Sequence, residues 1–151
     1  MTTKEKLMAD MKQAMKDREA GKLRLDVIRM VRSDIRNAEI NGKNKEELTE
    51  NEVLAVIMKA VKMREDSLAE FVKAKREDLI SQTKEELEIL KAYLPAAMSD
   101  EELTGIVKEA IASVGAVNPK DMGKVMKVVL PQVQGRADGR RINTIVKSLL
   151  Q

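Results

Sequence analysis

Apolar residues recur at helical spacing along nearly the whole chain, and this pattern constrains the fold more than any other feature of the sequence. Capping boxes, in which a serine or threonine precedes a glutamate by three residues, stand in front of three of the apolar stripes. They are formed by Thr2 and Glu5, by Thr49 and Glu52, and by Ser99 and Glu102. The chain holds only 3 prolines and 7 glycines, so few breaks interrupt these segments. The sequence therefore predicts an all-α fold.

Pro95 separates two groups of expected helices. The first group covers residues 2–21, 23–40, 49–72 and 77–93, and the second covers 99–114, 118–131 and 138–150. In the second group we expect Pro131 to bend or end its helix and Gly135 to supply a left-handed turn. The predicted architecture is an N-terminal helical hairpin or four-helix unit over residues 1–95, followed by a C-terminal three-helix bundle over residues 96–151.

Catalytic chemistry has few side chains to use in this chain. Histidine is absent, which removes the most common general base and metal ligand, and cysteine is absent, which removes thiolate chemistry. The pairs of adjacent glutamates fall in loops or first helical turns, where carboxylates satisfy free backbone amides. No glycine-rich phosphate loop of standard spacing occurs. We therefore expect no catalytic residue, no cofactor and no metal, and no enzyme that acts on its own.

The composition also indicates the cellular compartment in which we expect the protein. No segment approaches the roughly 20 consecutive apolar residues that span a bilayer. The N-terminus lacks the apolar core of a signal peptide, and the absence of cysteine gives no sign of an oxidising compartment. We expect a cytoplasmic protein without a membrane partner.

Positive charge gathers at the C-terminal end of the chain. The formal net charge is +3, but residues 119–151 carry seven basic side chains against two acidic ones. With only 1 Phe and 1 Tyr, the chain cannot stack many bases on aromatic rings, so contacts to the phosphates of a folded RNA are favoured over single-strand reading. The predicted nucleic-acid-binding residues are Lys120, Lys124, Lys127, Arg136, Arg140, Arg141 and Lys147.

Arg136, Arg140 and Arg141 surround the expected start of the last helix, where positive charge opposes the helix dipole. A bound phosphate would relieve this, because backbone amides at a helix N-terminus and flanking arginines both favour an anion. Asp138 can cap the same amides instead, and both possibilities stay open at this point. Gly123 lies inside the preceding helix, and we attribute it to close packing.

Two further rows of side chains are interpreted as structural. Arg29, Arg32 and Arg36 lie at i, i+3 and i+7, interspersed with Asp26 and Asp34, which is typical of a solvated or ion-paired helix face. Most methionines fall on core stripes, where their flexible side chains fill gaps in a core with almost no aromatic residues. Those expected to do so are Met8, Met11, Met122 and Met126.

Several motifs occur in a specific order along the chain. Leu94-Pro95 follows EELEIL, and DMGKVM, LPQVQGRADG and Ile142-Asn143 come after it. Upstream, IRMVRSDIRNAEI and MREDSLAEF extend the pattern. With these motifs the chain resembles the YqeY-like proteins of the GatB/YqeY group over nearly its whole length, which implies an all-helical, two-part fold.

The resemblance also implies a function. The group includes the tail domain of the B subunit of the glutamine-dependent aminoacyl-tRNA amidotransferase, a carbon–nitrogen ligase, and that tail contacts tRNA while catalysis belongs to other parts of the enzyme. We therefore expect tRNA association or support of an amidotransferase, rather than catalysis by this chain.

Three functional hypotheses follow. The first is a non-catalytic accessory protein that binds tRNA or another folded RNA, with an amidotransferase or a synthetase as a further partner. The second is a protein-interaction module whose N-terminal hairpin docks on a partner enzyme. The third and weakest is a helix-turn-helix DNA binder. Its groove-facing residues would be Arg140, Arg141, Asn143, Thr144 and Lys147.

Overall fold

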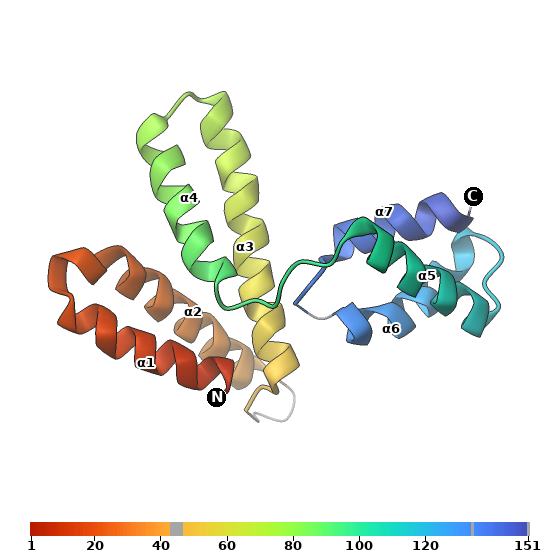
Figure 1. Ribbon diagram of the computed structural model, residues 1–151, viewed down its shortest axis with the longest axis horizontal. Coiled ribbons are helices and arrows are strands. Elements are labelled where there is room, and N and C mark those ends of the chain that lie inside the picture. The colour runs from red at the N-terminus through yellow and green to blue at the C-terminus, as the bar shows by residue number, and fades with distance from the viewer. Residues whose placement is uncertain (43–46, 134, 151) are drawn as a thin grey trace. The chain divides into compact units, whose positions relative to one another are not determined.

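The computed structural model describes residues 1–42, 47–133 and 135–150, and every regular element in these ranges is a helix (Figure 1). The all-α prediction is therefore confirmed. In chain order the elements, with η marking short 3-10 helices, are α1 (Thr3–Lys16), η1 (Arg18–Gly21), α2 (Lys22–Asn41), α3 (Glu50–Lys73), α4 (Glu77–Lys91), α5 (Asp100–Val114), η2 (Pro119–Asp121), α6 (Met122–Val133) and α7 (Gly139–Leu150).

Two compact units make up the chain, Met1–Leu94 and Pro95–Gln151. The boundary expected between residues 95 and 96 lies one residue from this division. The first unit holds α1 to α4, and the second holds α5, η2, α6 and α7.

In the first unit, α1 packs against α2 and α3 packs against α4, as two antiparallel pairs (Figure 1). α2 also contacts α3 and α4, and the shared core between the pairs contains Ile28, Val31 and Ile35 of α2. Within this unit the far ends of α3 and α4 pack only on each other. Val72, which lies at the far end of α3, is therefore 54% exposed although it is apolar.

The helix ends follow the local signals in the sequence. All three predicted capping boxes form, with the glutamate three residues into each helix bonded back to its cap. Gly115 ends α5 in the left-handed conformation, and Gly135 adopts the left-handed turn predicted after α6. The first helix is shorter than expected, because α1 ends at Lys16 and η1 occupies the stretch to Gly21.

In the second unit, α5, α6 and α7 pack pairwise around a core of aliphatic side chains. Met122 and Met126 pack against this core while partly buried, as expected. The fully buried side chains at its centre are Leu103, Val107, Val125, Val129, Ile142 and Val146.

Two expectations about α6 need correction. The helix does not end at Pro131 but runs to Val133, because a proline in the last turn removes only one backbone donor. Gln132 Nε2 also donates to the Val128 carbonyl over 3.1 Å, which satisfies an acceptor in that turn. Close packing does not explain Gly123, because no neighbouring heavy atom among the described residues lies within 4 Å of the place its Cβ would occupy.

Gly123→Ala should therefore raise the free energy of unfolding by up to about 1 kcal/mol, because alanine loses less backbone entropy on entering a helix. Urea unfolding followed by circular dichroism measures the change. Gly21→Ala is the matched control and should destabilise, because its Cβ would stand 2.3 Å from the Ala14 carbonyl oxygen. A lower stability for Gly123→Ala would contradict the open geometry described here.

Candidate nucleic-acid interface

The lysines of the predicted interface lie on the outside of the second unit. Lys120 belongs to η2, Lys124 and Lys127 belong to α6, and Lys147 belongs to α7, and all four are exposed. Helical spacing puts the first three on the side of η2 and α6 that faces away from the buried valines of α6. Within the described ranges, none of the four forms an ion pair with a carboxylate. Their charges are therefore not neutralised within the described part of the chain.

The two acidic residues of this segment are bound to backbone amides. Asp121 Oδ2 accepts a hydrogen bond from the Val117 N–H over 3.1 Å. Asp138 Oδ1 accepts one from the Arg141 N–H over 2.9 Å, and so caps the start of α7. Asp138 thus takes one of the amides that a phosphate would otherwise use at this helix end.

Arg136 and Arg141 hold the chain segment that leads into α5. Arg136 Nε donates to the Ala96 carbonyl over 3.0 Å, and its Nη2 lies 3.3 Å from Glu102 Oε2. Arg141 Nη2 donates to the Met98 carbonyl over 2.8 Å and also lies 2.8 Å from Asp100 Oδ1. The Met98 N–H in turn donates to the Arg136 carbonyl over 2.9 Å.

Arg140 and Arg141 both line a cavity of about 360 Å³ between the first turns of α5 and α7. Asp100, Thr104 and Thr144 also line this cavity. The structure thus brings these two arginines together. It places Arg136 between α6 and α7, bonded to the segment before α5, and it places Lys120, Lys124 and Lys127 on η2 and α6.

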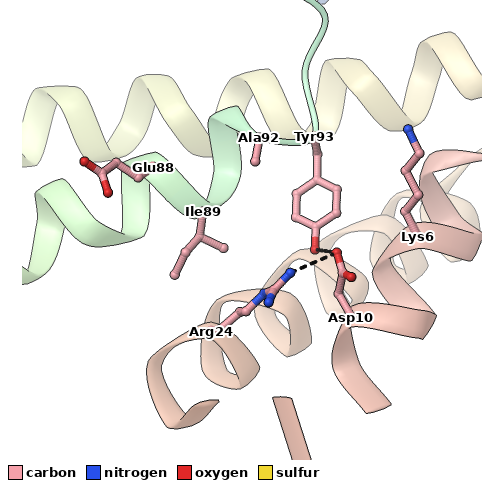
Figure 2. A pocket seen from close by; sticks show the side chains of 7 residues that line it. All are labelled: Lys6, Asp10, Arg24, Glu88, Ile89, Ala92 and Tyr93. Atoms are coloured by element: carbon pink, nitrogen blue, oxygen red, sulfur yellow. Dashed lines mark hydrogen bonds and ion pairs between the residues drawn. The ribbon is translucent and has the colours of Figure 1, made fainter. Parts of the chain in front are cut away.

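A second polar site, which sequence reasoning missed, lies in the first unit (Figure 2). Tyr93 Oη donates to Asp10 Oδ2, and Arg24 Nη2 lies 3.3 Å from the same carboxylate oxygen. These three residues border a cavity of about 380 Å³ together with Lys6, whose side chain extends away from them. Tyr93 and Asp10 are 83 residues apart in sequence, so no local pattern signals their contact.

The contacts at this second site indicate a structural role. Burial, followed by the hydrogen bond to Asp10 and the charge of that carboxylate, raises the pKa of the Tyr93 phenol above its ordinary value of 10.0. Tyr93 therefore keeps its proton and donates a hydrogen bond, which ties the C-terminal end of α4 to α1. Within the described residues, no group of three carboxylates that could hold a metal occurs.

The whole chain matches a known protein family. The family model described as Yqey-like protein covers residues 4–150. The chain belongs to the YqeY-like family. A relative from Kluyveromyces lactis, "Altered inheritance of mitochondria protein 41, mitochondrial", is 37% identical over 90% of this YqeY-like chain and 69% of its own length. A protein of the same name from Pyrenophora tritici-repentis is 31% identical over 87% of the chain and 71% of its own length.

These relatives contradict the expected cytoplasmic location, because their names place them in mitochondria. The expectation rested on the absence of cysteine and of a signal peptide, and neither feature separates the cytoplasm from the mitochondrion. In the described part of this YqeY-like chain, no helix combines the length and the apolar character that a bilayer crossing requires.

Arg141→Ala should lower the free energy of unfolding by about 1–2 kcal/mol, because the Met98 carbonyl and the Asp100 carboxylate both lose a charged donor. Urea unfolding monitored by circular dichroism measures the loss. Lys147→Ala on the same helix is the control, and a change within about 0.5 kcal/mol is expected for this exposed side chain. Equal effects of the two substitutions would show that the Arg141 contacts do not stabilise the unit.

The raised pKa of Tyr93 predicts an alkaline loss of stability. Below pH 10 the phenol is protonated in both folded and unfolded protein, so its bonds contribute fully. As the pH rises above 10, the unfolded protein releases this proton first, and the contribution is lost progressively toward the folded pKa. The difference in unfolding free energy between the wild type and Tyr93→Phe should therefore shrink above pH 10.

Near-ultraviolet absorbance measures the same titration directly, because Tyr93 is the only tyrosine and the chain has no tryptophan. In native protein the phenolate should form at higher pH than in urea-unfolded protein, and Asp10→Asn should reduce this difference. Identical native and unfolded titration curves would contradict the Tyr93–Asp10 contact.

Proposed function

We propose that this protein is a non-catalytic accessory protein that binds folded RNA, with tRNA as the favoured ligand, on the basic surface of its second unit. One observation carries the proposal. Lys120, Lys124 and Lys127 are exposed without ion pairs among the described residues, while both acidic side chains of the same segment are bound to backbone amides. Lysines in this state can neutralise RNA phosphates and displace the counterions condensed on the RNA, and this release drives binding.

The arginines contribute to this surface in a second way. Arg136 and Arg141 keep 38% and 35% of their side-chain surface exposed while they hold the segment before α5. A guanidinium has five N–H donors, so each arginine can contact a phosphate without giving up its carbonyl partner. The proposed surface therefore combines exposed lysines with arginines held by hydrogen bonds to Ala96 and Met98.

Membership in the YqeY-like family supports the accessory role in this proposal. The resemblance to the GatB/YqeY group favours an accessory role beside a glutamine-dependent amidotransferase or a synthetase, with the RNA held by this chain and the chemistry performed by the partner. The absence of histidine and cysteine fits that division of labour.

A helix-turn-helix role has less support. Of the five side chains that would face a major groove, Arg141 is bonded to Met98 and Asp100, and the Thr144 hydroxyl donates to the Arg140 carbonyl over 2.9 Å. Base reading would require both side chains to leave these partners.

Titration of labelled tRNA with the full-length protein at several salt concentrations tests the proposal. We expect the logarithm of the affinity to fall linearly with the logarithm of the salt concentration. Lys124→Glu/Lys127→Glu should weaken binding about tenfold or more and reduce the salt slope by about two, one unit for each lost phosphate contact.

Lys59→Glu/Lys84→Glu provides the matched control, because it changes the net charge equally at exposed positions of α3 and α4 in the first unit. This control should retain most of the affinity. Absence of binding at low salt, or equal losses in the two double variants, would falsify the proposal.

A further inference from the structure

One side of the α1–α2 pair carries methionines and arginines in two neighbouring rows. The rows consist of Met8, Met11 and Met15 on α1 and Arg29, Arg32 and Arg36 on α2. Each row has i, i+3, i+7 spacing and so follows one face of its helix. Arg32 Nη1 lies 3.0 Å from Met11 Sδ, which shows that the rows border the same groove. We call these six residues the Met–Arg groove.

The Met–Arg groove is open within the first unit. The other side of the α1–α2 pair faces α4, where Asp10 and Arg24 meet Tyr93 (Figure 2). On the groove side, Met8 is 37% exposed and Met15 is 50% exposed. The expectation that Met8 fills the core is therefore wrong. A cavity of about 270 Å³ lies at one end of the groove, lined in part by Met8, Arg32 and Arg36.

Carboxylates lie near the arginines of the groove, because Glu39 and Glu47 line the same cavity as Arg32 and Arg36. Across the described ranges, none of the three forms an ion pair with a carboxylate. The nearby Glu39 is held by Lys4 and by the Leu48 N–H, which donates over 3.0 Å. These two bonds, with a smaller effect of the Arg36 charge, lower the pKa of Glu39. The carboxylate of Glu39 is therefore paired with the ammonium of Lys4.

We propose that the Met–Arg groove binds an acidic amphipathic helix of a partner protein. Arginines at i, i+3 and i+7 span about 10 Å along α2, which matches carboxylates at the same spacing on a helix laid in the groove. Exposed methionines pack against apolar side chains of varied shape, so they suit the neighbouring face of such a helix.

Charge and apolar character together favour a helix over RNA as the occupant. Phosphates would satisfy the arginines, but they would leave the methionine row exposed to water or against a charged backbone. A helix with acidic residues along one edge and leucines beside them covers both rows at once. This surface belongs to the first unit and is separate from the RNA surface proposed on the second.

A synthetic helix tests the inference. The probe is a peptide of about 20 residues, long enough to run along the groove between α1 and α2, with glutamates at i, i+3 and i+7 and leucines on the adjacent face. The control peptide carries glutamine in place of each glutamate. Methionine methyl resonances of the full-length protein report where the peptide binds. The acidic peptide should shift the signals of Met8, Met11 and Met15 and leave that of the exposed Met63 on α3 unchanged.

Matched variants separate the two rows. Arg29→Glu/Arg36→Glu should reduce the affinity for the acidic peptide about tenfold or more, whereas Lys59→Glu/Lys84→Glu, with the same charge change, should have a much smaller effect. Met8→Gln/Met15→Gln should also weaken binding, and Met63→Gln should not. All these positions are exposed, and circular dichroism checks that each variant keeps its helices.

Several results would overturn the inference. Equal binding of the glutamate and glutamine peptides would remove the role of the arginines, and equal losses in the two charge variants would show unspecific attraction. Loss of tRNA binding in Arg29→Glu/Arg36→Glu, without any peptide-induced shift in the wild type, would assign the groove to RNA instead. The Lys124→Glu/Lys127→Glu variant should bind the peptide normally, so failure of the RNA proposal and failure of this one are distinguishable.

Discussion

The second unit has to bury a core with three short helices and no aromatic side chain, and it closes that core by tying the segment before α5 to α7. The centre of the core is entirely aliphatic. Small cores leave a narrow stability margin, so unsatisfied carbonyls at their edges are costly. Arg136 and Arg141 supply donors to the carbonyls of Ala96 and Met98, about 40 residues away along the chain. Their position at the start of α7 is unfavourable for the helix dipole but satisfies this requirement.

This division of roles follows from side-chain chemistry. A planar guanidinium can reach a carbonyl and a carboxylate at the same time, as Arg141 does with Met98 and Asp100. The ammonium of lysine is a strongly hydrated point charge on a flexible stem. Leaving a lysine side chain exposed to water therefore costs little free energy. The exposed lysines of η2 and α6 are therefore the part of the basic segment on which the RNA proposal mainly rests.

The first unit shows the same contrast between an anchored side and an open one. Tyr93, Asp10 and Arg24 fix α4 against α1 and α2, and the raised pKa of the phenol reflects the burial and charge of that contact. On the opposite side the Met–Arg groove exposes apolar and cationic rows that no element of the unit covers among the described residues. An anchored helix pair is a rigid base for binding a partner, because little ordering entropy remains to be lost.

The sequence by itself determined the helices, most of their ends and the family. Periodic apolar residues, three capping boxes and the turns at Gly115 and Gly135 all rest on bonds within a few residues, and such bonds leave local patterns. The tertiary structure alone decided which helix faces are buried, which stay exposed and which side chains meet across the fold. The Arg136–Ala96 and Tyr93–Asp10 contacts, the exposure of Met8 and Val72, and the open space at Gly123 depend on which helix packs beside which. A helical stripe states that a face is apolar, but burial requires a second element to cover it, and that element lies far away in the chain.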